Sequence, residues 1–221
     1  MEPVAVQIQR KGLAFDQTQI GKLRAEFSDA HWVRLSQLLE PSILDSLQVR
    51  LDNSQWQTKI HGEIGEEYVT SDLLANSLLH FAMNRPKFLA VIEEITGCKG
   101  LQWFRGRVYR VIAGAGHHDN WHDDVNHSNQ VGMSVNLSRG LFRGGLFMLR
   151  ERDSRQLLAN VANTGAGDAL IFRITSDLQH RISDLEGADP KTAFAGWFRS
   201  DRPECFRDSS IPIPADSHAI R

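Results

Sequence analysis

The chain changes character near residue 100, and this change limits its possible folds more than any other feature. Before residue 100, apolar residues recur at helical spacing. After it, short segments rich in aromatic and β-branched residues alternate with glycine-containing turns. Short strands at such spacing are typical of a sandwich or jelly roll. We therefore predict a mainly β protein with α-helices: a double-stranded β-helix (jelly roll) core with N-terminal helices packed on one sheet.

Four segments before residue 100 have the apolar spacing of amphipathic helices. Pro41 favours the first turn of one of them, and Gly97 is placed to end the last. Their apolar side chains would brace the barrel. The helices are expected at residues 19–30, 41–51, 71–84 and 86–96, with a short strand at 32–35.

Six strand-like segments follow, and turn-forming residues separate them. The length of 221 residues suits a single domain spanning 1–221. Within it we expect a helical N-terminal support at 1–100, the jelly-roll core at 101–200 and a polar C-terminal tail at 201–221. The strands are expected at 101–113, 131–137, 145–149, 157–161, 169–174 and 192–198.

Net charge and cysteine content indicate which kinds of binding partner and which cellular compartment to expect for this protein. The formal net charge of −2 gives no sign of a nucleic-acid or anionic-membrane partner. No stretch approaches the roughly 20 apolar residues of a membrane span, and the N-terminus lacks the pattern of a signal peptide. Cys98 and Cys205 lie far apart, which fits a reducing compartment. We predict a cytoplasmic protein without a nucleic-acid or membrane partner.

Two histidines and one aspartate form a candidate metal-binding trio. His122 and Asp124 make an H-x-D pair, and His180 lies far along the chain. On a strand, residues two positions apart face the same way, so His122 and Asp124 could reach one ion. His180 is expected after a strand-like stretch and a short loop. Two imidazoles and one carboxylate are the ligand set of non-haem iron(II) oxygenases. An isolated H-x-D pair is also common by chance.

Lys191 supports the interpretation of the trio as a metal-binding site. It comes eleven positions after His180, at the head of an expected strand. A lysine there would place a compact positive charge with three donors inside the barrel, where it could pair with a carboxylate. Taken alone, Lys191 would be read as a solvated lysine at the end of a strand.

From Arg105 to Arg199 the sequence resembles the iron(II)- and 2-oxoglutarate-dependent dioxygenases, in particular the prolyl 4-hydroxylase-like branch. The order and spacing of the matching pieces carry the resemblance, since each piece alone is weak. The pieces are Arg107-Val-Tyr109, His122-Asp123-Asp124, the Gly144-Gly145-Leu-Phe-Met-Leu strand, Gly167-Asp168-Ala-Leu-Ile-Phe, His180, Lys191 and Trp197-Phe198.

The resemblance implies a role for each matching residue. His122, Asp124 and His180 would bind Fe(II), and Lys191 would pair with the distal carboxylate of 2-oxoglutarate. Tyr109 would line the cosubstrate pocket, although a strand aromatic in the core is an equally good interpretation of that residue. Asn136 would be a further hydrogen-bonding residue for the cosubstrate.

The resemblance also implies a reaction. Oxidative decarboxylation of 2-oxoglutarate with O2 would release succinate and CO2 and hydroxylate a C–H bond of a peptidyl proline, an amino-acid-like compound or another small molecule. Ascorbate is an optional further cofactor. Because related halogenases lack the carboxylate found here at Asp124, the resemblance favours hydroxylation.

Two other interpretations of the chain stay open. One is a cupin-like metalloenzyme that does not use 2-oxoglutarate. The other is a non-catalytic jelly roll that serves as a binding or sensing module. His118 and His122 have the spacing of a helical zinc pair, but the flanking glycines argue against a helix. We expect substrate contacts from loops at 60–71 and 114–121, with His117, His118, Asn120 and Trp121 as candidates, or else an exposed polar loop.

Overall fold

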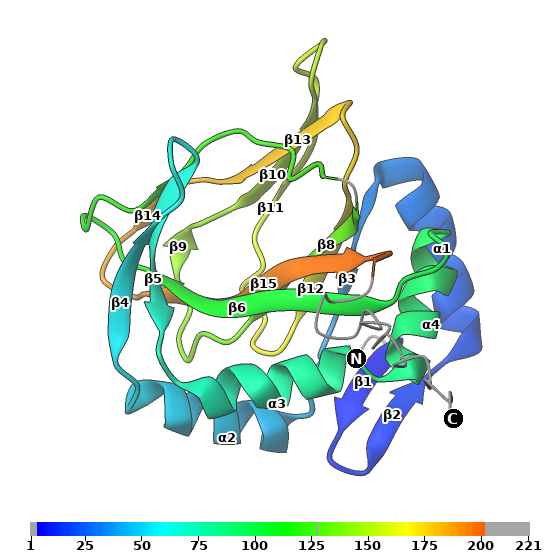
Figure 1. The fold of residues 1–221 in the computed structure, drawn as a ribbon, viewed down its shortest axis with the longest axis horizontal. Coiled ribbons are helices and arrows are strands. Elements are labelled where there is room, and N and C mark those ends of the chain that lie inside the picture. The colour runs from blue at the N-terminus through cyan, green and yellow to red at the C-terminus, as the bar shows by residue number, and fades with distance from the viewer. Residues whose placement is uncertain (1–3, 127, 202–221) are drawn as a thin grey trace, which may run out of the picture.

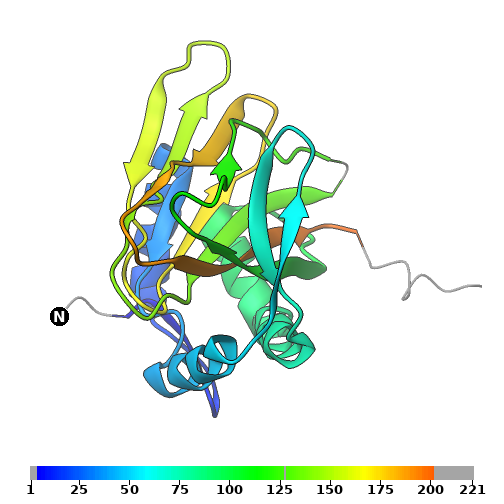
Figure 2. The same ribbon diagram turned by 90° about the vertical axis from the view of Figure 1, so that its left-hand side faces the viewer.

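The computed structural model describes residues 4–126 and 128–201, so the expected tail falls almost wholly outside the described residues. Two antiparallel sheets face each other, and the helices cover the outer side of the larger one (Figures 1 and 2). The predicted jelly-roll core with N-terminal helices on one sheet is confirmed. In the described part of the chain, no helix is both long and apolar enough to cross a membrane.

The helices begin and end close to where the apolar pattern predicted. Asp16 and Asp72 cap the first and third by accepting hydrogen bonds from backbone N–H groups, and proline opens the second and fourth. Gly97 follows the fourth helix in a left-handed conformation. The helices are α1 (Gln17–Ala30), α2 (Pro41–Asp52), α3 (Leu73–Met83) and α4 (Pro86–Thr96).

The larger sheet has eight strands in the order β3-β12-β8-β15-β6-β5-β4, with β7 paired to β5. All of its strand pairs are antiparallel. Its strands are β3 (Trp32–Leu35), β4 (Trp56–Ile60), β5 (Gly65–Thr70), β6 (Trp103–Val111), β7 (His118–Asp119), β8 (Asn129–Asn136), β12 (Ala169–Arg173) and β15 (Lys191–Arg199).

The smaller sheet has the order β11-β10-β13 and lies across from β6 and β15 (Figure 1). Two short pairs, β1-β2 and β14-β9, complete the described strands. These elements are β10 (Phe147–Glu151), β11 (Leu157–Val161), β13 (Leu178–Ile182), β1 (Val6–Gln9), β2 (Gly12–Phe15), β9 (Arg143–Gly144) and β14 (Leu185–Glu186).

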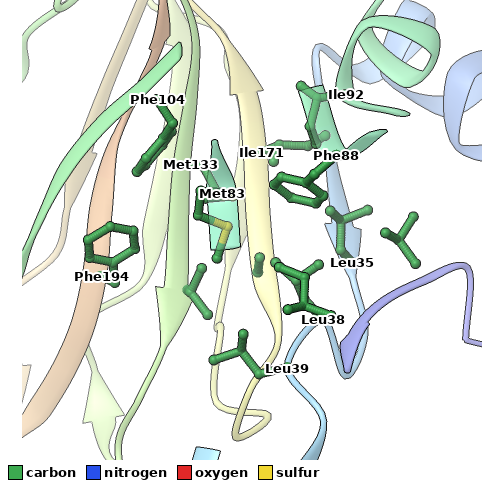
Figure 3. Close-up of a cluster of buried hydrophobic side chains, with 14 of the residues drawn as sticks. Leu35, Leu38, Leu39, Met83, Phe88, Ile92, Phe104, Met133, Ile171 and Phe194 are labelled. Carbon is green, nitrogen blue, oxygen red and sulfur yellow. The ribbon is translucent and has the colours of Figure 1, made fainter. Parts of the chain in front are cut away.

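The main hydrophobic core lies between the helices and the larger sheet. Phe88 from α4 packs against Phe198 from β15. Phe104 packs against Phe194, and both rings are seen in Figure 3. A second, smaller core fills the space between the two sheets around Phe147, Leu149 and Phe172. The second core leaves part of the barrel interior open, and the cavity described below lies there.

Eight strands of the described chain were not predicted: β1, β2, β4, β5, β7, β9, β13 and β14. The segment 60–71, expected as a substrate loop, is mostly the β4–β5 hairpin. β4 is almost entirely exposed, so its sequence lacks the apolar alternation by which a strand is recognised. Its backbone pairing with β5 decides its conformation instead.

Candidate metal centre

His180 lies at the centre of β13 and points into the barrel. We expected it after a strand and a loop, and the structure corrects this: Leu178 and His180 alternate with less buried residues on one strand. The imidazole packs against Phe172, with ring centroids 4.5 Å apart, and His180 is only 7% exposed. An apolar wall therefore fixes the orientation of this ring.

His122 is joined to His180 by an isolated antiparallel bridge. Each backbone N–H donates to the other residue's carbonyl, with N–O distances of 3.1 Å and 2.8 Å, and the ring centroids lie 4.3 Å apart. Nδ1 of His122 lies 2.7 Å from the carbonyl oxygen of Asn120. If Nδ1 carries the proton, Nε2 presents a lone pair toward Asp124, as a metal ligand requires.

Asp124 is not on a strand, so the expected strand geometry of the H-x-D pair is wrong. Its φ of 56° places it in the left-handed region, where aspartate is tolerated better than most residues. The side chain of Asp123 accepts from the N–H of Val125 and pairs with Arg152, and Asn129 donates to the Asp124 carbonyl. This turn, rather than strand alternation, aims the carboxylate at the two imidazoles.

The three side chains meet at one point. Their possible ligand atoms all lie within 4.8 Å of one another. Nε2 of His180 is 3.2 Å from Oδ2 of Asp124, and Nε2 of His122 is 3.6 Å from Oδ1. Two ligands at about 2.1 Å from one ion and at right angles to each other would lie about 3.0 Å apart. The trio fits a divalent transition metal in both donor type and spacing.

The charges of the trio depend on one another. Burial opposes protonation of His122, but the carboxylates of Asp124 and Asp119 outweigh it and raise the pKa of His122 to about 9. Burial also opposes ionisation of Asp124, yet the two imidazoles hold its pKa well below its usual range. Without a metal, His122 therefore carries a proton at neutral pH, and a bound cation would replace that proton.

Trp197 is a neighbour of the trio whose contact could not be expected from sequence. Its indole Nε1 donates to Oδ2 of Asp124 at 2.6 Å. Asp119 is a second such neighbour: it lies 3.4 Å from Nδ1 of His122 and accepts from the N–H of Ile182. The bonds that Trp197 and Ile182 donate join segments distant in sequence, so no local pattern indicates them, whereas Asp119 lies only three positions before His122.

The trio lies on the wall of a cavity of about 340 Å³. Tyr109 lines this cavity and is 7% exposed. Burial, followed by the charges of Glu67 and Asp119, raises the pKa of Tyr109, so its hydroxyl keeps its proton. Tyr109 is thus a buried strand aromatic that also presents a polar group to the cavity.

Lys191 is buried beside the cavity but is not part of its wall. Its ammonium donates to the carbonyl of Gly145 at 2.8 Å, and Val111, its partner on β6, does line the cavity. Lys191 shares its face of β15 with the cavity residues Ala195 and Trp197. Desolvation lowers the pKa of Lys191 to about 8, with Asp119 opposing the shift.

Asn136 does not reach the trio or the cavity. Its amide donates to the carbonyl of Gly165 at 3.1 Å, and its side-chain oxygen accepts from the N–H of Ser138 at 2.9 Å. These bonds tie the end of β8 to two neighbouring loops. The contacts of Asn136 in the structure are therefore with backbone groups of the fold.

A charged cluster on the same cavity wall was not anticipated. The Glu67 carboxylate lies 2.5 Å from Nε of Arg107 and 3.0 Å from Nε2 of His61. Glu67 is only 8% exposed, and all three residues line the cavity. Arg107 was matched only as part of the Arg107-Val-Tyr109 piece, and the hairpin that brings Glu67 to it was not predicted.

The four candidate substrate residues before the trio separate into two groups. His117 and His118 line the cavity. Asn120 donates to the carbonyl of Glu63, and the Trp121 ring is covered by the guanidinium of Arg150 at 4.0 Å. Asn120 and Trp121 are outside the cavity wall and have structural partners of their own.

Comparison with known proteins gives likeness in structure only. No family model and no curated protein sequence matches the chain. A Pseudomonas putida prolyl-4-hydroxylase is 14% identical with a TM-score of 0.62, over 83% of this chain and 100% of that one. A Burkholderia pseudomallei oxidoreductase of the 2OG-Fe(II) oxygenase family is 14% identical with a TM-score of 0.63, over 90% and 97%.

A third solved structure has a different activity. The epimerase SnoN, in complex with Fe3+, alpha ketoglutarate and nogalamycin RO, is 11% identical with a TM-score of 0.56, over 83% of this chain and 84% of that one. Structures of this group therefore include both prolyl hydroxylases and an epimerase, and the shared architecture does not itself select a reaction. At these identities the likeness establishes the fold alone, which the chain shares with these solved structures.

Proposed function

We propose that the protein is an Fe(II)- and 2-oxoglutarate-dependent dioxygenase that hydroxylates a C–H bond and releases succinate and CO2. The observation that carries this proposal is the convergence of His122, Asp124 and His180 on one cavity wall. Three protein ligands leave the remaining coordination positions for cosubstrate and O2, and the iron would supply the redox chemistry. The likeness in fold to solved oxygenases supports the same conclusion.

Lys191 is the proposed anchor for the distal carboxylate of 2-oxoglutarate. An ammonium has three donors, and Gly145 accepts one of them. An unpaired lysine buried in the barrel costs stability, which a carboxylate partner would offset. The Tyr109 hydroxyl, kept protonated by burial, is a second donor for the cosubstrate on the adjacent strand.

Arg107, Glu67 and His61 form the proposed contact for the primary substrate. The ion pair between Arg107 and Glu67 lies on the cavity wall, and Glu67 already holds the guanidinium through Nε. The remaining donors of Arg107 suit a carbonyl or carboxylate oxygen. A peptidyl proline, an amino-acid-like compound and other polar small molecules all offer such a group, and we propose a substrate from these classes.

The test of this function is succinate release from 2-oxoglutarate in the presence of Fe(II) and O2, measured without an added primary substrate. The matched control is His180→Ala, which removes one proposed ligand. Wild-type turnover that the control lacks would support the proposal. Metal-dependent oxidation that proceeds without 2-oxoglutarate would favour the cupin-like alternative, and absence of both metal binding and turnover would favour the non-catalytic one.

Replacing Arg107 by glutamine is expected to weaken the response of the enzyme to its primary substrate and to leave the turnover of 2-oxoglutarate alone nearly unchanged. Substrate-free succinate release should stay within about threefold of wild type, because Arg107 is assigned no contact with 2-oxoglutarate. The stimulation of turnover by a panel of prolyl peptides and free amino acids should fall about tenfold or more. Succinate release with and without each panel member measures both quantities.

The matched control for this substitution is Arg105→Gln, on the same strand at an exposed position. This variant should behave as wild type in both assays. Equal loss of substrate-free turnover in Arg107→Gln would contradict the assignment of Arg107 to the substrate side of the cavity.

A further inference from the structure

The two carboxylate oxygens of Asp124 differ in their hydrogen bonding. Oδ2 accepts from Nε1 of Trp197 at 2.6 Å, which is short for an N–H···O bond. Oδ1 lies 3.6 Å from the nearer nitrogen of His122, beyond hydrogen-bond distance. Oδ2 also lies 3.2 Å from Nε2 of His180, so the indole holds the carboxylate oxygen that is nearest to a proposed ligand nitrogen, while Oδ1 lies toward the imidazole of His122.

The indole is held in place by the strands on both sides of it. Trp197 lies opposite Gly132 of β8 and Arg105 of β6, at the middle of the larger sheet. Its ring packs against the smaller core that contains Phe172. A Cβ on Gly132 would come 2.1 Å from the Phe172 ring, so a side chain at that position would disturb the packing beside the indole. The donor is thus part of the barrel wall and not of a loop.

The backbone of Asp124 is held separately. Its left-handed φ of 56° is supported by Asn129, whose amide donates to the Asp124 carbonyl at 3.0 Å. With the backbone held by the turn and Oδ2 held by the indole, the carboxylate has little freedom to rotate about its side-chain bonds. An indole N–H can only donate, so it cannot compete with the carboxylate for a metal ion.

We propose that Trp197 is a positioning residue that holds Asp124 as a one-oxygen ligand, and so keeps one coordination position of the metal free. A carboxylate released from the indole could turn both oxygens to the ion, as carboxylates do at other metal sites. The second oxygen would then occupy a position needed by cosubstrate or O2. This inference rests on the proposed metal site and goes beyond it.

Cobalt(II) is the probe for this proposal, because its visible absorption weakens as its coordination number rises. Trp197→Phe removes the N–H while keeping an aromatic ring. The variant should bind Co(II) about tenfold more weakly and should show weaker visible bands than wild type at saturation. Trp103→Phe is the matched control: it also loses an indole N–H bonded to an aspartate, Asp201, and should leave both quantities unchanged.

A measurement on the wild-type protein keeps the proposal testable if Trp197→Phe does not fold. The chain has five tryptophans and therefore five indole N–H signals in a ¹H–¹⁵N NMR spectrum. One of them should resist exchange with solvent and should shift strongly when Co(II) binds. A spectrum in which no indole signal responds to Co(II) would overturn the proposal.

The outcomes separate this inference from the function on which it rests. If wild type binds Co(II) and Trp197→Phe reproduces its bands and affinity, the positioning role is wrong while the metal site stands. If wild type does not bind Co(II), the metal site fails and the positioning role fails with it. Succinate release alone would not distinguish these cases, because any damage to the site lowers it.

Discussion

Replacing Lys191 by methionine is expected to weaken 2-oxoglutarate binding strongly and at the same time to stabilise the protein. The ammonium of Lys191 is buried, with its pKa lowered from 10.5 to about 8 by desolvation. That change in pKa means that burying the charge lowers the free energy of unfolding by about 3 kcal/mol near neutral pH. The substitution removes this cost but also loses the hydrogen bond to Gly145, which offsets about 1 kcal/mol of the gain. We expect a net gain on the order of 2 kcal/mol in the free energy of unfolding.

The gain in stability should depend on pH in one direction. Between about 8 and 10.5 the unfolded chain holds a proton on Lys191 that the folded chain has released, so wild-type stability rises with pH in this window. Lys191→Met lacks this contribution, and its advantage should narrow as pH rises through the window. Urea denaturation of both proteins at about pH 7 and about pH 10 measures the difference.

Lys191→Met should bind 2-oxoglutarate more weakly, although its fold is more stable. Removing the buried partner of a carboxylate is expected to weaken 2-oxoglutarate binding about 100-fold or more, as measured by calorimetry with Mn(II) in place of iron. Lys59→Met, at an exposed position of β4, is the matched control and should change neither quantity. Tight 2-oxoglutarate binding by Lys191→Met would show that the cosubstrate is anchored elsewhere or not used.

Replacing Asp124 by asparagine is expected to remove metal binding with little change in shape. Asparagine has nearly the same size but no charge, and the site would keep only two imidazoles. We expect metal affinity to fall about 100-fold or more and succinate release to become undetectable. Calorimetry with Mn(II) or Co(II) measures the first effect, and the turnover assay measures the second.

The same substitution should change the titration of His122. The carboxylate of Asp124 is one of the groups that raise the pKa of His122 to about 9 against the effect of burial. Its loss should lower that pKa toward the ordinary value of 6.5, which NMR titration of the metal-free protein would detect. Stability from the protonated imidazole is present below 6.5 and lost as pH rises through 9 in wild type, so this loss should move to lower pH in the variant.

Asp123→Asn is the matched control for Asp124→Asn. Asp123 is the adjacent carboxylate, but its side chain pairs with Arg152 and with the N–H of Val125. Its substitution should weaken metal binding far less than that of Asp124. Equal losses in the two variants would mean that the turn as a whole matters and that Asp124 is not a ligand.

Local sequence pattern predicted all four described helices and seven of the fifteen described strands, because their signals are local. Pro41 and Gly97 mark helix ends by backbone preference alone, and the apolar period of α4 matches its buried face. The β4–β5 hairpin was missed because β4 is exposed and carries no alternation. The strand β13 was missed although it is as long as the predicted β10 and β11, and its ladder with β10 determines its conformation.

The amino-acid sequence by itself determined the fold class and the identity of the metal-ligand candidates, because residue type and order are enough to indicate His122, Asp124 and His180. Only the tertiary structure decided how these three side chains come close enough to share one metal ion. The bridge between the two histidines and the indole bond from Trp197 to Asp124 both join segments distant in sequence. Such contacts depend on strand register and side-chain packing, which no local pattern contains.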